Sequence, residues 1–196
     1  MTVNILGVAS SMRNNSSSTK TLKITLDHAK QNGANTRLID LSKTILPMYS
    51  PGGIDSTELK KITEDVTWAN VFILASPDYH GSLSGVMKNF LDYFWSEFAG
   101  KTFGYVCASH EKGLTVMDQM RTAIRQCYGW SLPYGISVNS DEDFDKNGDI
   151  TNLKLQGRLA MMARDLTVYG SIIHKQFDED LDGSNSNTFA AYYRNN

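Results

Sequence analysis

Short apolar runs alternate with segments of helical periodicity along most of this chain. The strand-like runs are residues 3–9, 36–41, 71–75, 102–108 and part of 130–138. Apolar residues recur every three or four positions, as on a helix face, in residues 17–32, 56–69, 84–98, 116–127 and 155–166. Parallel strands need crossover connections, which are usually helices. Five strands alternating with five helices therefore predict an α/β sandwich with a mostly parallel sheet and helices on both faces.

Composition limits the class of protein further. With 196 residues, of which 41% are hydrophobic and 20% charged, the chain suits one globular domain. Because no stretch approaches the roughly 20 apolar residues of a membrane span, we expect no membrane helix. The N-terminus shows neither a charged start nor a long apolar run, so we expect a cytoplasmic protein. Cys107 and Cys127 form neither a disulfide framework nor a metal motif.

The charges are unevenly distributed. The net charge of −2 resides in residues 174–196, an acidic, Ser/Asn-rich segment, and leaves residues 1–173 neutral. We therefore predict a domain over 1–173 and a C-terminal tail over 174–196 that is mobile or covered by a partner. A neutral body with an acidic tail offers no basic patch, so a nucleic-acid partner is not expected.

Two loops carry unusual polar residues. In an open parallel sheet, ligands bind beyond the carboxyl ends of the strands, near the point where strand order reverses. The loop at residues 10–19 gathers six hydroxyls, two amides and Arg13 just before a helix. The free N–H groups of a helix start, together with these donors, favour a phosphate site. A solvated loop with a good helix cap is an equally open interpretation.

The second loop, residues 76–85, follows the strongest strand prediction. Pro77, Gly81 and Gly85 shape its backbone, while Tyr79 and His80 offer flat faces and polar edges. Such a loop is suited to hold a planar heterocycle. The alternative is an ordinary tight turn whose tyrosine covers the helix behind it.

Other candidate motifs fail. No GxGxxG follows the first strand, and residues 100–102 only imitate the end of a Walker A loop, because a strand follows them. Residues 143–150 match the opening of an EF-hand loop, but Lys154 stands where the bidentate glutamate belongs. We therefore interpret 143–150 as an acidic turn and predict no metal site.

The two loops together resemble the NADPH-dependent FMN reductase family of flavodoxin-like oxidoreductases. Its first-loop pattern GSxRxxS is matched by residues 10–16, with Ser10 in place of the glycine. Its second pattern, P-[DE]-Y-H/N-x-S-x-x-G-x-x-K-N, is matched by residues 77–89, with Asp92 following. Ser10 is compatible with the pattern if its φ stays negative.

The resemblance implies a cofactor, FMN, and a site. It implies that the FMN phosphate is held by Ser11, Arg13, Ser16 and Ser18. It also implies that the isoalloxazine is lined by Pro77, Asp78, Tyr79, His80 and Gly81, with Ser109 in a third segment at 109–113. That segment lacks the glycine-rich run usual in the family. Lys88, Asn89 and Asp92 match the pattern but are expected to act structurally.

The resemblance also implies a fold and an activity. The fold is a flavodoxin-like three-layer sandwich with a five-stranded sheet of order 2-1-3-4-5. The activity is ping-pong hydride transfer from NADPH or NADH to FMN N5, and then to a small-molecule acceptor such as a quinone, flavin, ferric chelate, azo compound or metal oxyanion. Two alternatives are a flavodoxin-like electron carrier without NAD(P)H activity and a flavin-free interaction domain on the same fold.

Five aromatic residues crowd the segment after the second loop: Phe90, Tyr93, Phe94, Trp95 and Phe98. A single core-facing helix stripe needs fewer, so some should face outward at a subunit interface. The family resemblance also implies a homodimer or homotetramer. The alternative is an unusually aromatic core helix.

Overall fold

A six-stranded parallel sheet forms the centre of the molecule. The structure, a computed structural model, describes residues 2–53 and 55–194. The strands are β1 (Asn4–Ala9), β2 (Asn35–Asp40), β3 (Val71–Pro77), β4 (Thr102–Ala108), β5 (Trp130–Ser131) and β6 (Ile136–Val138). They follow the order β2-β1-β3-β4-β5, with β6 also paired to β4. The predicted strand order is therefore confirmed.

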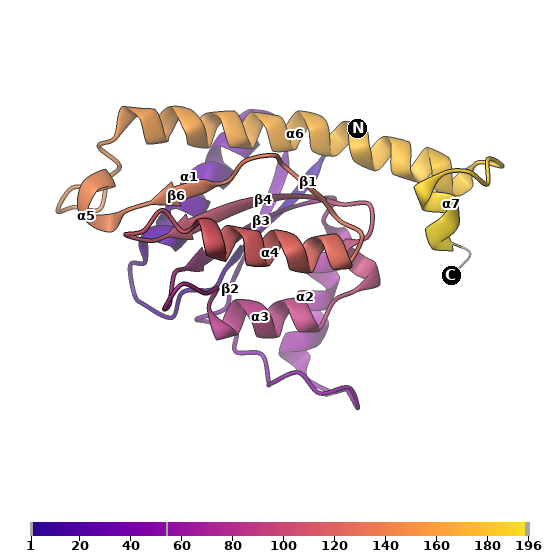
Figure 1. The fold of residues 1–196 in the computed structure, drawn as a ribbon, viewed down its shortest axis with the longest axis horizontal. Coiled ribbons are helices and arrows are strands. Elements are labelled where there is room, and N and C mark those ends of the chain that lie inside the picture. Colours follow the sequence, from indigo (N-terminus) through magenta and orange to yellow (C-terminus); the bar gives the residue numbers. More distant parts are fainter. Residues whose placement is uncertain (1, 54, 195–196) are drawn as a thin grey trace.

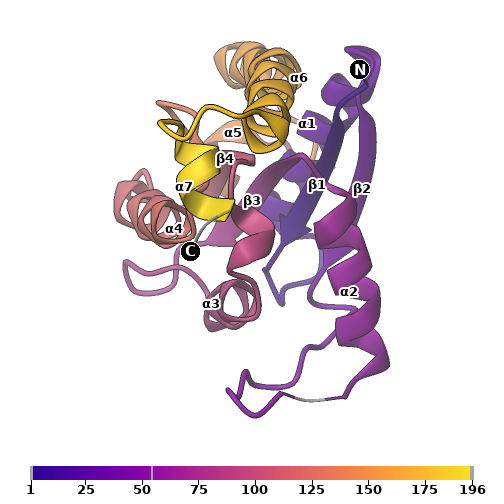
Figure 2. The same ribbon diagram turned by 90° about the vertical axis from the view of Figure 1, so that its right-hand side faces the viewer.

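Helices cover both faces of this sheet (Figures 1 and 2). On one face lie α1 (Ser17–Gln31) and α6 (Leu153–Asp182), and on the other lie α2 (Thr57–Trp68), α3 (Gly85–Asp92) and α4 (Leu114–Gln126). The short elements are η1 (Ser96–Phe98), α5 (Ser140–Asp143) and α7 (Phe189–Arg194). Among the described residues, no helix is both long and apolar enough to cross a membrane.

The alternating pleat of β1 explains how α1 is positioned. Ile5 belongs to the core beneath α1 and α6, whereas Leu6 belongs to the core beneath α2, α3 and α4. Gly7, on the same side of the strand as Ile5, allows α1 to approach closely, since a Cβ there would lie 2.7 Å from Leu26 Cδ1. This close packing brings the N-terminus of α1 to the carboxyl end of β1.

The predicted fifth strand is interrupted. Residues 130–138 form two short segments, β5 and β6, that pair with the two ends of β4. Pro133 lies between them and has no backbone N–H for the ladder, which accounts for the break.

The last helix is longer than its apolar stripe predicts. The boundary expected at residue 173 falls inside α6, which continues to Asp182 and extends beyond the sheet (Figure 1). The residues after this expected boundary pack against the rest of the domain. The ring of Phe177 covers Gly100 and contacts Phe189 and Tyr193, and Ala191 is fully buried.

The aromatic segment divides into core and surface residues. The predicted helix at 84–98 is shorter, because α3 ends at Asp92. Phe90, Phe94 and Phe98 are buried, and Trp95 is 59% exposed. A homodimer or homotetramer stays a prediction.

The structural role expected for Asn89 is confirmed. Its side-chain oxygen accepts from Tyr49 N at 2.8 Å, and its amide donates to Pro47 O at 2.8 Å. Asn89 thereby ties the loop after β2 to α3.

Candidate functional site

Three loops at the carboxyl ends of β1, β3 and β4 enclose one cavity of about 820 Å³. Nine of the ten predicted site residues line it: Ser11, Arg13, Ser16, Pro77, Asp78, Tyr79, His80, Gly81 and Ser109. These loops are far apart in the sequence, and the order β1-β3-β4 makes them neighbours. The position agrees with the rule that parallel sheets bind ligands at this edge.

The first loop presents an open helix start to the cavity. Asn15 has a left-handed φ of 56°, and Ser16 follows as the N-cap of α1 without capping it through its side chain. Its hydroxyl lies 2.9 Å from that of Ser18, which is fully buried behind it. With no acidic residue in the first turn of α1, the helix dipole at this end is uncompensated.

The second loop forms a tight reverse turn. Tyr79 and Ser82 exchange two backbone hydrogen bonds, of 3.0 and 3.2 Å. Between them, His80 and Gly81 have φ of 59° and 75°, the pair of left-handed values that a type I′ turn requires. Tyr79 and His80 both line the cavity from this turn.

Asp78 braces the second loop against the third. One carboxylate oxygen accepts from Gly81 N at 2.8 Å, and the other accepts from Ser109 Oγ at 2.8 Å. The backbone N–H of Asp78 donates to Ala108 O at 2.9 Å. The hydroxyl of Ser109 also accepts from Glu111 N at 3.0 Å. The polar atoms of Asp78 and Ser109 are thus used to hold the loops together.

The third loop depends on Gly113, which is the N-cap of α4. Its φ is +58°, and a Cβ there would lie 2.4 Å from Cys107 Sγ. Burial, with a smaller contribution from the charge of Asp78, raises the pKa of the Cys107 thiol far above its usual value. Cys107 is therefore a neutral, inert wall beneath the loop.

Sequence reasoning missed part of the lining. Four lining residues lie outside the predicted site segments: Ala108, Leu114, Thr115 and Ser140. Six others fall within the predicted loops at 10–19 and 109–113 without having been singled out: Asn14, Asn15, Ser17, His110, Glu111 and Gly113. Gly113 was within the expected third segment, where a lone glycine gives a weak signal. Ser140 lies at the start of α5, and no local pattern links it to the other loops.

The 143–150 segment is a turn whose carboxylates are used internally. Asp143 is buried and accepts from Asn139 N and from the Asn152 amide, both within 2.8 Å. Asp145 accepts from Asn147 N and Asp149 N at 2.8 and 2.9 Å. Across the described ranges, no group of three or more His, Cys, Asp or Glu side chains is placed to hold a metal ion.

Comparison with known proteins agrees with this geometry. Residues 3–143 match the model of the NADPH-dependent FMN reductase family. An FMN-dependent NADPH-azoreductase from Staphylococcus aureus is 29% identical over 133 residues, which cover 63% of this chain and 69% of the relative.

Two solved structures share the fold. An oxidoreductase from Corynebacterium diphtheriae superposes with a TM-score of 0.72 at 18% identity, covering 89% of this chain and 98% of that one. A flavoenzyme NAD(P)H:acceptor oxidoreductase from Paracoccus denitrificans gives 0.71 at 14% identity, covering 88% and 98%. The strand order β2-β1-β3-β4-β5 with helices on both faces makes the sandwich flavodoxin-like. The chain belongs to the NADPH-dependent FMN reductases, oxidoreductases that use FMN as cofactor and NADPH as electron donor.

Proposed function

We propose that the three-loop cavity holds FMN, with its phosphate at the first loop and its ring between the second and third loops. The observation that carries this proposal is the single cavity of about 820 Å³ with two chemically different ends. One end has hydroxyls, amides and Arg13 at a helix start, and the other has a flat-faced turn. Cavities of this size suit a cofactor.

The residues present fit FMN. At the phosphate end, Ser11, Arg13 and Ser16 offer donors beside the uncompensated dipole of α1. At the ring end, the backbone of 77–81 is fixed by the Asp78 brace and by the left-handed turn. Ser18 would act indirectly by orienting the hydroxyl of Ser16.

The chemistry itself belongs to the cofactor. When bound, FMN would supply the redox chemistry, namely acceptance of a hydride from the nicotinamide and delivery of the electrons to a second acceptor in a ping-pong cycle. The second and third loops, braced by Asp78, would hold the ring, and the first loop would hold the charged phosphate. It also leaves the cavity accessible beside the exposed Tyr79. No acid–base pair from the protein is required.

The acceptor is a small molecule that reaches the exposed ring. The azoreductase name of the S. aureus relative makes an azo compound the first acceptor to assay. Quinones, free flavin, ferric chelates and metal oxyanions complete the panel, because all of them require only access to the reduced ring.

A visible spectrum of the purified protein with FMN tests the activity. Anaerobic NADPH, and then NADH, should bleach the bound flavin, and addition of an acceptor should restore the yellow colour. Bound flavin that neither nucleotide bleaches would instead identify an electron carrier. A protein that takes up no FMN would refute the assignment of all three loops.

Replacement of Arg13 tests the phosphate end. Arg13→Ala removes a charge-assisted contact, so FMN affinity should fall by about 2 kcal/mol, or roughly thirtyfold. Arg125→Ala, on the exposed last turn of α4, is the matched control and should leave the FMN Kd unchanged. Equal FMN affinity of Arg13→Ala and wild type, measured by flavin fluorescence quenching, would show that the phosphate lies elsewhere.

A further inference from the structure

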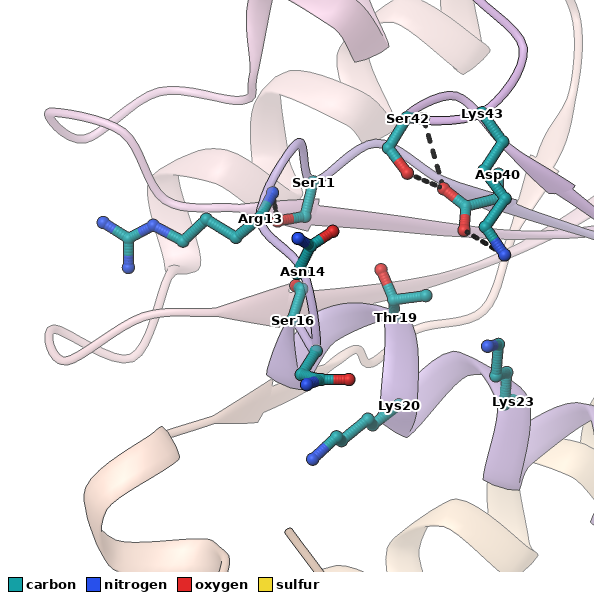
Figure 3. A pocket seen from close by; sticks show the side chains of 11 residues that line it. Ser11, Arg13, Asn14, Ser16, Thr19, Lys20, Lys23, Asp40, Ser42 and Lys43 are labelled. Carbon is teal, nitrogen blue, oxygen red and sulfur yellow. Dashed lines mark hydrogen bonds and ion pairs between the residues drawn. The ribbon is translucent and has the colours of Figure 1, made fainter.

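A second hollow, of about 480 Å³, borders the first loop (Figure 3). Its walls beyond that loop are the first two turns of α1, with Thr19, Lys20 and Lys23, and the turn after β2, with Asp40, Ser42 and Lys43. Strand β2 pairs with β1 on the side opposite to β3. The second hollow therefore lies on the β2 side of a loop whose other side faces the cavity, and Ser11 and residues 13–16 border both.

The hollow concentrates positive charge in a chain of net charge −2. Four cationic side chains line it, against the single carboxylate of Asp40. That carboxylate is already engaged, since it accepts from Ser42 Oγ at 2.6 Å and from Ser42 N at 3.1 Å, with Lys43 Nζ at 3.9 Å. Within the described residues, Lys23 forms no ion pair.

The cations of the hollow point in different directions. In Figure 3 the guanidinium of Arg13 extends away from Asp40, whereas Lys23 points from α1 toward the turn that carries Asp40 and Lys43. Lys20 lies against another segment, because a Cβ on Gly148 would be 1.9 Å from its ammonium nitrogen. Lys23 and Lys43 are thus the pair that faces one space from two different elements, with the hydroxyls of Thr19 and Ser42 beside them.

We propose that Lys23 and Lys43 form a second phosphate site, which binds the 2′-phosphate of NADPH. This inference rests on the proposed function, which gives the FMN phosphate the donors of Ser11, Arg13 and Ser16. Those three residues border both spaces, whereas Lys23 and Lys43 border the second hollow and not the cavity. NADPH differs from NADH only by the 2′-phosphate, a dianionic monoester of the kind that paired ammonium groups attract. Because residues 13–16 border both spaces, a donor bound in the cavity can extend across this loop and reach the second hollow with its 2′-phosphate. The pair makes the chain prefer NADPH.

Charge-removing variants test the preference. Lys23→Gln and Lys43→Gln, singly and together, keep side-chain length and remove one charge each. In the FMN-saturated double variant, the ratio of kcat/KM for NADPH to that for NADH should fall about tenfold. Lys30→Gln is the matched control, because it removes the same charge from α1 two turns further along the same helix face. The control should shift the ratio less than about twofold.

A binding experiment separates recognition from turnover. By calorimetry on the FMN-loaded protein, adenosine 2′,5′-bisphosphate should bind about tenfold more tightly than 5′-AMP. The preference should shrink when NaCl is raised from about 0.05 to about 0.3 M. The double variant should lose the preference, and its FMN Kd should match that of wild type.

Two results would overturn the proposal. A raised FMN Kd in Lys23→Gln or Lys43→Gln would show that these lysines serve the phosphate of FMN. An unchanged bisphosphate preference in the double variant would show that they are ordinary solvated lysines. If neither nucleotide reduces the wild-type protein, the proposed function fails, whereas the bisphosphate preference still decides whether the second site exists.

Discussion

Asp78 is where the structure and the family pattern give different roles to one residue. The pattern implies that Asp78 lines the flavin, whereas its carboxylate here accepts from Gly81 N and Ser109 Oγ, both at 2.8 Å. If the role is to brace the loops, removing the carboxylate should destabilise the protein even without FMN. If the role is contact with the cofactor, only FMN binding should change.

The size of the effect follows from the two hydrogen bonds. A hydrogen bond to a charged group contributes about 1.5–3 kcal/mol, and the half-buried position of Asp78 reduces this, so Asp78→Ala should cost about 2–4 kcal/mol. For a protein of this size that corresponds to a Tm lower by about 5–10 °C. Asp78→Asn keeps an acceptor for Gly81 N and loses the one for Ser109, so it should cost about half as much.

Urea unfolding of the FMN-free protein measures the first effect, and FMN titration measures the second. Asp92→Asn is the matched control, since its carboxylate is paired only with Lys88 on the exposed surface of α3, where a pair contributes about 0–1 kcal/mol. A loosened loop should also raise the FMN Kd by roughly tenfold. Wild-type stability of FMN-free Asp78→Ala, together with weakened FMN binding, would refute the bracing role and assign Asp78 to the cofactor.

Two further predictions concern buried titratable groups. Burial lowers the pKa of Lys101 to about 8, so between pH 8 and 10.4 the unfolded state holds more protons and stability rises with pH. Lys101→Met removes this titration. Between pH 7 and pH 10, the free energy of unfolding should therefore rise by about 2 kcal/mol more in wild type than in Lys101→Met. An equal change in both proteins would contradict the lowered pKa of Lys101. Burial also raises the pKa of Cys107 and Cys127, so iodoacetamide at pH 8 should leave both unmodified in the native protein and label both in urea, as mass spectrometry would show. Rapid native labelling of Cys107 would mean that the third loop opens.

The layers of the fold were predictable from the sequence because burial leaves a local pattern. Strand β3 is buried along its whole length and reads as a continuous apolar run, and α4 carries its buried residues at helical spacing. The break between β5 and β6 was less visible, because Pro133 alone does not show where pairing resumes. The extension of α6 escaped the prediction, since beyond Leu166 the apolar stripe thins out, and Gly170, which packs against Val71 of β3, is the last buried residue of the helix.

The candidate site was predictable in its residues and not in its connections. Motif spacing placed Arg13 and the 77–81 loop at one edge of the sheet, and in the structure they line one cavity there. However, the hydrogen bonds that hold the loops together join residues distant in sequence. Asp78 and Ser109, for example, are 31 residues apart. The basic hollow had no signal either, because Lys23 and Lys43 belong to different elements, which only the pairing of β2 with β1 brings together.

Ser10 shows how a departure from the family pattern becomes part of the site. It replaces a glycine, yet its φ is not among the positive values of the described residues, so the side chain causes no backbone strain. Its buried hydroxyl donates to Ala75 O at 3.0 Å and accepts from Ser84 Oγ at 2.9 Å. Ser84 is the N-cap of α3, and its backbone N–H donates to Ser76 Oγ at 3.0 Å. The first loop is thereby fastened to both ends of the second loop through atoms that never reach the cavity. A glycine at residue 10 would keep the two bonds to the backbone of this residue, from Ser10 N to Ala75 O at 3.0 Å and from Ser84 Oγ to Ser10 O at 3.2 Å. It would lose both bonds of the hydroxyl, so the serine strengthens a link between the two loops that the backbone already makes.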